Sequence, residues 1–97
     1  MLLASFSISL YQLFTSHVDA FKVEATNAIL GRLGKDVYET LKYDLQRQYK
    51  IELTKHSSYT LHELNAALKV LLGEDSTRLI MRTINGEIER LAQDEMR

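Results

Sequence analysis

The chain has 97 residues, of which 45% are hydrophobic and 26% are charged, and its 12 basic and 13 acidic residues give a formal net charge of −1. This length and composition indicate one soluble domain, and the near-neutral charge argues against a general electrostatic affinity for nucleic acid or anionic membranes. The sequence has no cysteine, which excludes disulfides and cysteine-ligated metal sites and favours a reducing, cytoplasmic location.

The first 18 residues contain no Asp, Glu, Lys or Arg. A signal peptide would need a basic start, and a membrane-spanning helix would need about 20 mainly apolar residues, whereas serine, threonine and glutamine interrupt this segment. The sequence therefore predicts no membrane span. Residues 5–10 alternate polar and apolar side chains as a short strand does, but a helical pattern continues past residue 10 and favours a helix.

Residues 1–17 are therefore interpreted as an apolar N-terminal helix. Their large apolar side chains recur at alternating steps of three and four residues, as in the seam of a coiled coil. An apolar face of this kind is unfavourable in water, so we expect it to cover the core of the same chain or to form a homodimer or partner interface. The residues predicted for this interface are Leu3, Phe6, Leu10, Leu13 and Phe14.

Residues 18–97 are predicted to form a single helical domain that begins with two helices. The first runs from about residue 18 to residue 33 and ends at Gly34. Its expected buried face contains Phe21, Ala25, Ile29 or Ala28, and Leu33. The second begins at residue 35 or 36 and runs to about residue 49. Its expected buried face contains Val37, Leu41, Leu45 and Gln48 or Tyr49.

Residues 50–59 form the only long connection in this pattern. Ile51 and Leu53 lie on either side of Glu52, so their side chains are expected to reach the core from an extended backbone. The polar residues 55–58 that follow are expected to be exposed.

The segment from residue 59 to residue 84 contains the strongest local signals in the chain. Thr60 and Glu63 fit a capping box, in which each side chain satisfies a backbone N–H group at the start of a helix. The apolar face of that helix contains Leu61, Leu64, Leu68, Leu71 and Leu72. Gly73 is expected to end the helix in the left-handed conformation, and Asp75 or Ser76 is expected to cap the next helix.

The last helix is predicted to continue to the end of the chain. Its expected buried face contains Leu79 or Ile80, Ile84, Ile88 and Leu91. Gly86 lies inside this helix at a cost of about 1 kcal/mol relative to alanine, so either another helix crosses closely there, which we expect, or the helix bends. Together the elements predict an all-α fold, a compact bundle of four to five helices with short connections and antiparallel or orthogonal packing.

Residues able to carry chemistry are scattered along the sequence. His17, His56 and His62 lack the spacing of metal ligands on one helix, and no serine lies in a nucleophile motif. The four glycines are isolated, so none forms a phosphate-binding loop. The sequence therefore predicts no catalytic residue, no metal and no cofactor, and we expect a protein that is not an enzyme.

The corner at Gly73 also permits a helix-turn-helix interpretation. In that case the recognition helix begins near Ser76 and exposes Thr77, Arg78, Met81, Arg82 and Asn85. The predicted nucleic-acid contacts are Arg78, Arg82 and Asn85. Acidic residues at positions 74, 75, 87 and 89 lie beside them and weaken phosphate binding, so a DNA-binding regulator is the alternative hypothesis.

The order of these helix ends and apolar residues resembles a family of small archaeal all-helical domains described as a Nitrosopumilus output domain. The resemblance covers about residues 18–92 and departs from the family pattern at Asp75-Ser76, where Gly-Ala is expected. The matching residues are Leu33-Gly34, Leu41, Leu45, Tyr49, Ile51, Leu64, Leu68, Leu72-Gly73-Glu74, Leu79/Ile80 and Ile84.

This resemblance implies an archaeal intracellular module that is placed in signalling proteins as an output element, and it implies no catalytic or ligand residues. The leading hypothesis is therefore a non-enzymatic helical protein-interaction module, a signalling or regulatory output domain. Its expected partner is another protein, with the apolar residues 1–17 in a homodimer or partner interface.

Overall fold

The computed structural model describes residues 19–95. Its helices are residues 19–31, α2 (Lys35–Tyr49), a short 3₁₀ helix η1 (His56–Ser58), α3 (Leu61–Leu72) and α4 (Glu74–Glu95). The predicted all-α fold, a small bundle of helices with short connections, is confirmed. The five residues predicted for an N-terminal interface, Leu3, Phe6, Leu10, Leu13 and Phe14, lie outside the described residues. No helix between residues 19 and 95 is long and apolar enough to cross a membrane.

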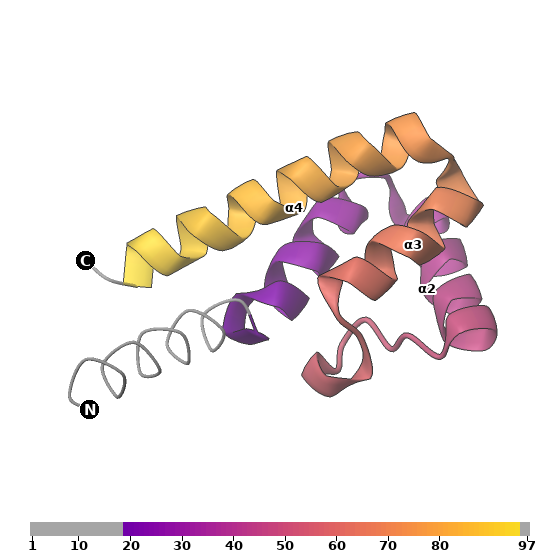
Figure 1. Ribbon diagram of the computed structural model, residues 1–97, viewed down its shortest axis with the longest axis horizontal. Helices are drawn as coiled ribbons and strands as arrows, with labels where there is room; N and C mark the ends of the chain where they lie inside the picture. The colour runs from indigo at the N-terminus through magenta and orange to yellow at the C-terminus, as the bar shows by residue number, and fades with distance from the viewer. Residues whose placement is uncertain (1–18, 96–97) are drawn as a thin grey trace, which may run out of the picture.

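The longest helix, α4, runs along one side of the molecule (Figure 1). The helix over residues 19–31 lies beside α4 and runs in the opposite direction, whereas α2 is steeply inclined to both. α3 packs against α4 and also contacts α2. The connections before α2 and before α4 are short, so the long segment between α2 and α3 is the main irregular part of the described chain.

The core lies where all four long helices and the 50–60 segment meet. Its apolar side chains come from the four longer helices, each of which turns one face inward, and from the segment between α2 and α3. The fully or nearly fully buried apolar residues are Ala25, Ile29, Leu30, Leu41, Leu45, Ile51, Leu53, Tyr59, Leu64, Ala67, Leu68, Ile80, Met81, Ile84 and Ile88. Partly buried Phe21, Tyr38, Tyr49, Leu61, Leu71, Leu72 and Leu91 pack against them.

A tight turn after residue 31 joins the first helix to α2. The N–H groups of Arg32 and Leu33 donate to the carbonyls three residues earlier, which satisfies the last carbonyls of the helix. Gly34 then adopts φ 105° and ψ 155°, a conformation that is essentially restricted to glycine. Its carbonyl accepts the first bond of α2 from Tyr38 N at 2.9 Å. The predicted bounds of α2 are therefore confirmed.

Lys50 ends α2 in the left-handed conformation, with φ 56° and ψ 29°. The N–H of Lys50 donates to Gln46 O at 3.1 Å, which is the bond of the αL C-cap motif, and the N–H of Ile51 donates to Leu45 O at 3.0 Å. This reversal directs the chain back toward the core. Ile51 and Leu53 are 2% and 1% exposed, which confirms that both side chains reach the core from the connection.

The start of α3 follows the predicted cap. Thr60 Oγ1 accepts from Glu63 N at 3.1 Å, as the capping box requires. The Glu63 carboxylate accepts from the Thr60 hydroxyl at 3.2 Å and not from the Thr60 N–H group, so only the threonine half of the predicted capping box is confirmed. Thr60 is thus the N-cap of α3.

The corner between α3 and α4 is tighter than the sequence predicts. Gly73 is its single connecting residue, and its φ of 90° and ψ of 164° lie outside the left-handed helical region that was expected. The Gly73 carbonyl accepts from Thr77 N at 3.2 Å, so α4 begins at Glu74. The prediction that Asp75 or Ser76 caps this helix is wrong, because both residues lie within its first turn.

Two other expectations are corrected by the structure, and one open alternative on α4 is decided. Leu33 and Val37 were predicted on buried faces but are 40% and 44% exposed, because both lie near the turn where the first helix and α2 diverge. On α4 it is Ile80 that is buried, while Leu79 is 64% exposed. A Cβ at Gly86 would meet no atom within 4 Å, so the predicted close helix crossing at this glycine is wrong.

Candidate functional site

A buried lysine connects the first helix to the segment before α3. The side chain of Lys22 is almost fully buried, and its ammonium group donates to His56 O at 2.7 Å and to Tyr59 O at 2.6 Å. The Asp19 carboxylate lies 3.7 Å from the ammonium group and supplies a partly exposed counter-charge. Sequence reasoning missed this residue, although Lys22 lies one turn before Thr26 on the buried face of its helix.

Asn27 forms a second connection between the same elements. Its amide donates to Leu53 O at 3.1 Å and to Val23 O at 2.8 Å, and its oxygen accepts from the Tyr38 hydroxyl. Tyr38 is partly buried and packs against the core. Lys22 and Asn27 satisfy carbonyls that an irregular segment would otherwise leave buried without partners.

The histidines within the described residues serve structure or lie at the surface. His56 Nδ1 lies 2.7 Å from Asp19 O, which ties η1 to the first helix, and His62 is exposed on α3. No group of three or more possible metal ligands gathers between residues 19 and 95. The predicted absence of a metal, a cofactor and a catalytic residue stays a prediction.

Tyr59 is the one buried titratable group with a shifted pKa in this network. Burial raises the pKa of the Tyr59 phenol, and the neighbouring Thr26 hydroxyl acts in the opposite direction. The Lys22 ammonium lies 4.9 Å from the centre of the Tyr59 ring, a cation–π distance. These groups are packed into the core, so the network is a structural support.

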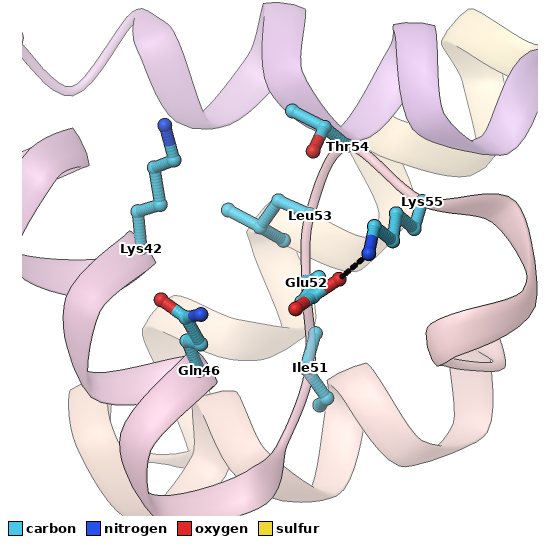
Figure 2. Close-up of a pocket in the computed structure, with 7 residues that line it drawn as sticks. All are labelled: Lys42, Gln46, Ile51, Glu52, Leu53, Thr54 and Lys55. Atoms are coloured by element: carbon cyan, nitrogen blue, oxygen red, sulfur yellow. Dashed lines mark ion pairs between the residues drawn. The ribbon is translucent and has the colours of Figure 1, made fainter.

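The first surface hollow lies between α2 and the extended segment after it (Figure 2). It has a volume of about 240 Å³ and is lined by Lys42, Gln46, Ile51, Glu52, Leu53, Thr54 and Lys55. Its carboxylate, Glu52, forms an ion pair of 2.8 Å with Lys55 in the same wall. The lining therefore offers a small apolar floor and one lysine, Lys42, and it contains no pair of groups arranged for acid–base chemistry.

A second hollow lies between α2 and the end of α3 and is called here the acidic-rimmed groove. It has a volume of about 310 Å³ and is lined by Asp36, Val37, Thr40, Leu41, Asp44, Leu71 and Leu72. Its apolar floor comes from both helices. Val37 is the most exposed of the apolar residues in its lining, at 44%.

The polar residues of this groove follow one edge of α2. Asp36, Thr40 and Asp44 are spaced at steps of four residues, so they lie above one another on the helix surface. The two carboxylates are separated by two helical turns, about 12 Å. The opposite wall is the C-terminal end of α3, where unpaired carbonyls carry partial negative charge. The groove thus combines an apolar floor with a negative rim.

A third hollow lies between α3 and α4 and is called here the basic hollow. It has a volume of about 320 Å³ and is lined by Asn65, Lys69, Glu74, Arg78, Met81, Arg82 and Asn85. It contains Arg78, Arg82 and Asn85, the three residues predicted as nucleic-acid contacts, together with Lys69 and Asn65, which sequence reasoning missed. Their shared position was not visible from sequence because it depends on the angle between α3 and α4.

Other parts of the helix-turn-helix expectation are wrong. Thr77 and Met81 were expected to be exposed for contacts, but they are 0% and 9% exposed and belong to the core face of α4. A single residue joins α3 and α4, whereas a helix-turn-helix has a turn of about three to four residues. The first turn of α4 also carries Glu74 and Asp75, which lie 3.6 Å and 3.9 Å from the Arg78 guanidinium.

Comparison of the chain with protein families, with curated proteins and with solved structures gives no match. The resemblance to the Nitrosopumilus output domain therefore stays a prediction.

Proposed function

We propose that this chain is a non-enzymatic helical protein-interaction module whose docking surface is the acidic-rimmed groove between α2 and α3. The observation that carries the proposal is the composition of this groove: an apolar floor from two helices, open to solvent at Val37, beside the two carboxylates of Asp36 and Asp44. A surface of this kind favours binding of an amphipathic helix, whose apolar face enters the groove.

The charge of the rim selects the class of partner. Asp36 and Asp44 lie two turns apart on α2, and the C-terminal end of α3 adds partial negative charge on the other side. We therefore propose that the occupant is a basic amphipathic helix with a row of leucines and with lysine or arginine about two turns apart on its flank. Such complementarity favours encounter and register, and the small apolar floor favours a transient contact.

The proposal is tested with two synthetic helical peptides that share one leucine row and differ only in whether the flanking residues are all lysine or all glutamate. Amide shifts of the labelled protein are followed by NMR during titration with each peptide. We expect the lysine peptide to shift residues 36–44 and 71–72, and we expect Val37→Asp to abolish these shifts. Val70→Asp is the matched control, because Val70 is an exposed valine of α3 outside the groove.

The opposite results would overturn the proposal. Equal shifts with the glutamate peptide would show that the acidic rim does not select the partner. Loss of binding in Val70→Asp to the same degree as in Val37→Asp would show that the contact does not use the groove. Absence of shifts with either peptide would remove this docking surface.

We also propose that the uncharged residues 1–17 form a homodimer contact through Leu3, Phe6, Leu10, Leu13 and Phe14. The support for this contact is their coiled-coil spacing in the sequence. Sedimentation equilibrium is expected to give a dimer for the chain and a monomer for the double variant Phe6→Glu, Leu10→Glu. A monomer for the unaltered chain would refute the contact.

We also propose a biological role, an organism class and a cellular location for this module. The resemblance to archaeal output domains supports a signalling or regulatory role in an archaeon, and the lack of cysteine supports a cytoplasmic location. A pull-down from an archaeal lysate in which the bound proteins lose affinity for Val37→Asp, but not for Val70→Asp, is the corresponding test.

A further inference from the structure

We infer that the basic hollow between α3 and α4 is a binding site for a phosphate-bearing anion. It shares no residue with the acidic-rimmed groove, so the inference stands independently of the proposed protein partner. Three cations from two helices converge on it: Lys69 from α3 and Arg78 and Arg82 from α4.

Bringing these cations together lowers the stability of the folded chain when no anion is bound. Arg78 and Arg82 lie four residues apart on one helix face, where like charges repel each other. Within the described residues, Arg82 and Lys69 have no ion pair, and the two ion pairs of Arg78 are long, at 3.6 Å and 3.9 Å. An anion seated between the helices would relieve this repulsion.

The chemistry of the lining fits a phosphate group. A guanidinium group presents several N–H donors that match phosphate oxygens, and a lysine adds a mobile point charge. The amides of Asn65 and Asn85 add two further donors from opposite sides of the hollow. Partly buried Asn65 and buried Met81 lie at its base, so a bound group would be partly removed from water and its interactions would be screened less.

The position of the one carboxylate agrees with this assignment. Glu74 lines the hollow, but its side chain is 71% exposed and is directed to Arg78. Within the described residues, neither Lys69 nor Arg82 forms an ion pair with this carboxylate, so both keep their charge available. With three cations and one carboxylate, the lining keeps an excess of positive charge although the whole chain has a net charge of −1.

The test measures binding of two phosphate sources by the full chain at low salt: inorganic tripolyphosphate by calorimetry, and a short DNA duplex by fluorescence anisotropy. We expect Arg82→Gln and Lys69→Gln each to weaken binding about tenfold, the loss of one charge-assisted contact. Lys35→Gln is the control, because Lys35 is exposed on α2 and outside the hollow, and a change below about twofold is expected.

The two probes separate the sources of the phosphate. Binding of tripolyphosphate with no duplex binding identifies a free phosphorylated ligand, whereas binding of both, lost together in Arg82→Gln, identifies nucleic acid. Equal weakening by Lys35→Gln and Arg82→Gln would show that only net charge matters and would overturn the inference. No binding of either probe would also overturn it. Unchanged unfolding midpoints of the variants show that the fold is kept.

Discussion

The Lys22 ammonium group lies 2.6 Å from the backbone oxygen of Tyr59 and 4.9 Å from the centre of the Tyr59 ring. One side chain therefore binds both the main chain and the aromatic face of the same residue. Because Tyr59 immediately precedes the N-cap of α3, this contact sets where α3 begins relative to the first helix. The buried cation thus supports the arrangement of helices on which both proposed surfaces depend.

Replacement of Lys22 by methionine should destabilise the protein by about 2–4 kcal/mol, because two carbonyls lose their charged donor and one of them is buried. Urea unfolding followed by circular dichroism measures this change. Lys55→Met is the control, since Lys55 is an exposed lysine that pairs with Glu52 alone among residues 19–95, and its midpoint should stay unchanged. A midpoint for Lys22→Met equal to that of the control would show that the buried bonds contribute nothing.

Stability should fall as pH rises above about 10, the ordinary pKa of a tyrosine. Burial raises the pKa of Tyr59, so the folded state keeps the phenolic proton at pH values where the unfolded state has begun to lose it. The stability linked to this proton is complete below pH 10 and is lost as pH rises toward the folded pKa. Chemical unfolding between pH 9 and pH 11 should show a shallower decline for Tyr59→Phe, and exposed Tyr43→Phe should follow the parent protein.

Replacement of Gly73 and of Gly86 by alanine should change the stability of the protein in opposite directions. Gly73 has φ 90° and ψ 164°, a region essentially closed to other residues, so Gly73→Ala should cost about 1–3 kcal/mol. Gly86 lies in an exposed helical position where an added Cβ meets nothing within 4 Å, so Gly86→Ala should stabilise by about 0.5–1 kcal/mol. Thermal unfolding distinguishes the two. A loss of stability in Gly86→Ala would contradict the open space at Gly86 and would indicate that another helix crosses closely there.

Alanine substitutions at the two predicted helix caps, Thr60 and Ser76, should have different effects on stability. Thr60→Ala removes the hydroxyl that accepts from Glu63 N and should cost about 1 kcal/mol. Ser76→Ala changes an exposed residue inside the first turn of α4 and should stay within about 0.5 kcal/mol of the parent protein. Denaturant unfolding of the pair measures both values, and a larger loss in Ser76→Ala than in Thr60→Ala would contradict the observed start of α4.

Much of the fold follows from periodic patterns in the sequence. The bounds of α2, the Thr60 cap and the inward side chains of Ile51 and Leu53 are all local consequences of spacing and backbone chemistry. The errors arose where tertiary geometry decides. Val37 has the spacing of a core residue but lies at the edge of the α2–α3 contact, and this error conceals the groove.

The candidate surfaces were harder to predict than the helices. Arg78, Arg82 and Asn85 share a helix face that spacing reveals, yet Lys69 and Asn65 join them only because α3 meets α4 at a sharp single-residue corner. Lys22 was missed for a related reason. The sequence shows a lysine on an apolar helix face, but it does not show which distant carbonyls that lysine binds.

The Lys22 bonds have a consequence for the order of folding. They join residues that are 34 and 37 positions apart, whereas α3 and α4 are neighbours along the chain and make contacts that close only short loops. We expect the α3–α4 corner to be formed in the transition state and the Lys22 bonds to form after it. Loss of Lys22 should then accelerate unfolding and leave the folding rate nearly unchanged, so this residue prolongs the lifetime of the folded chain.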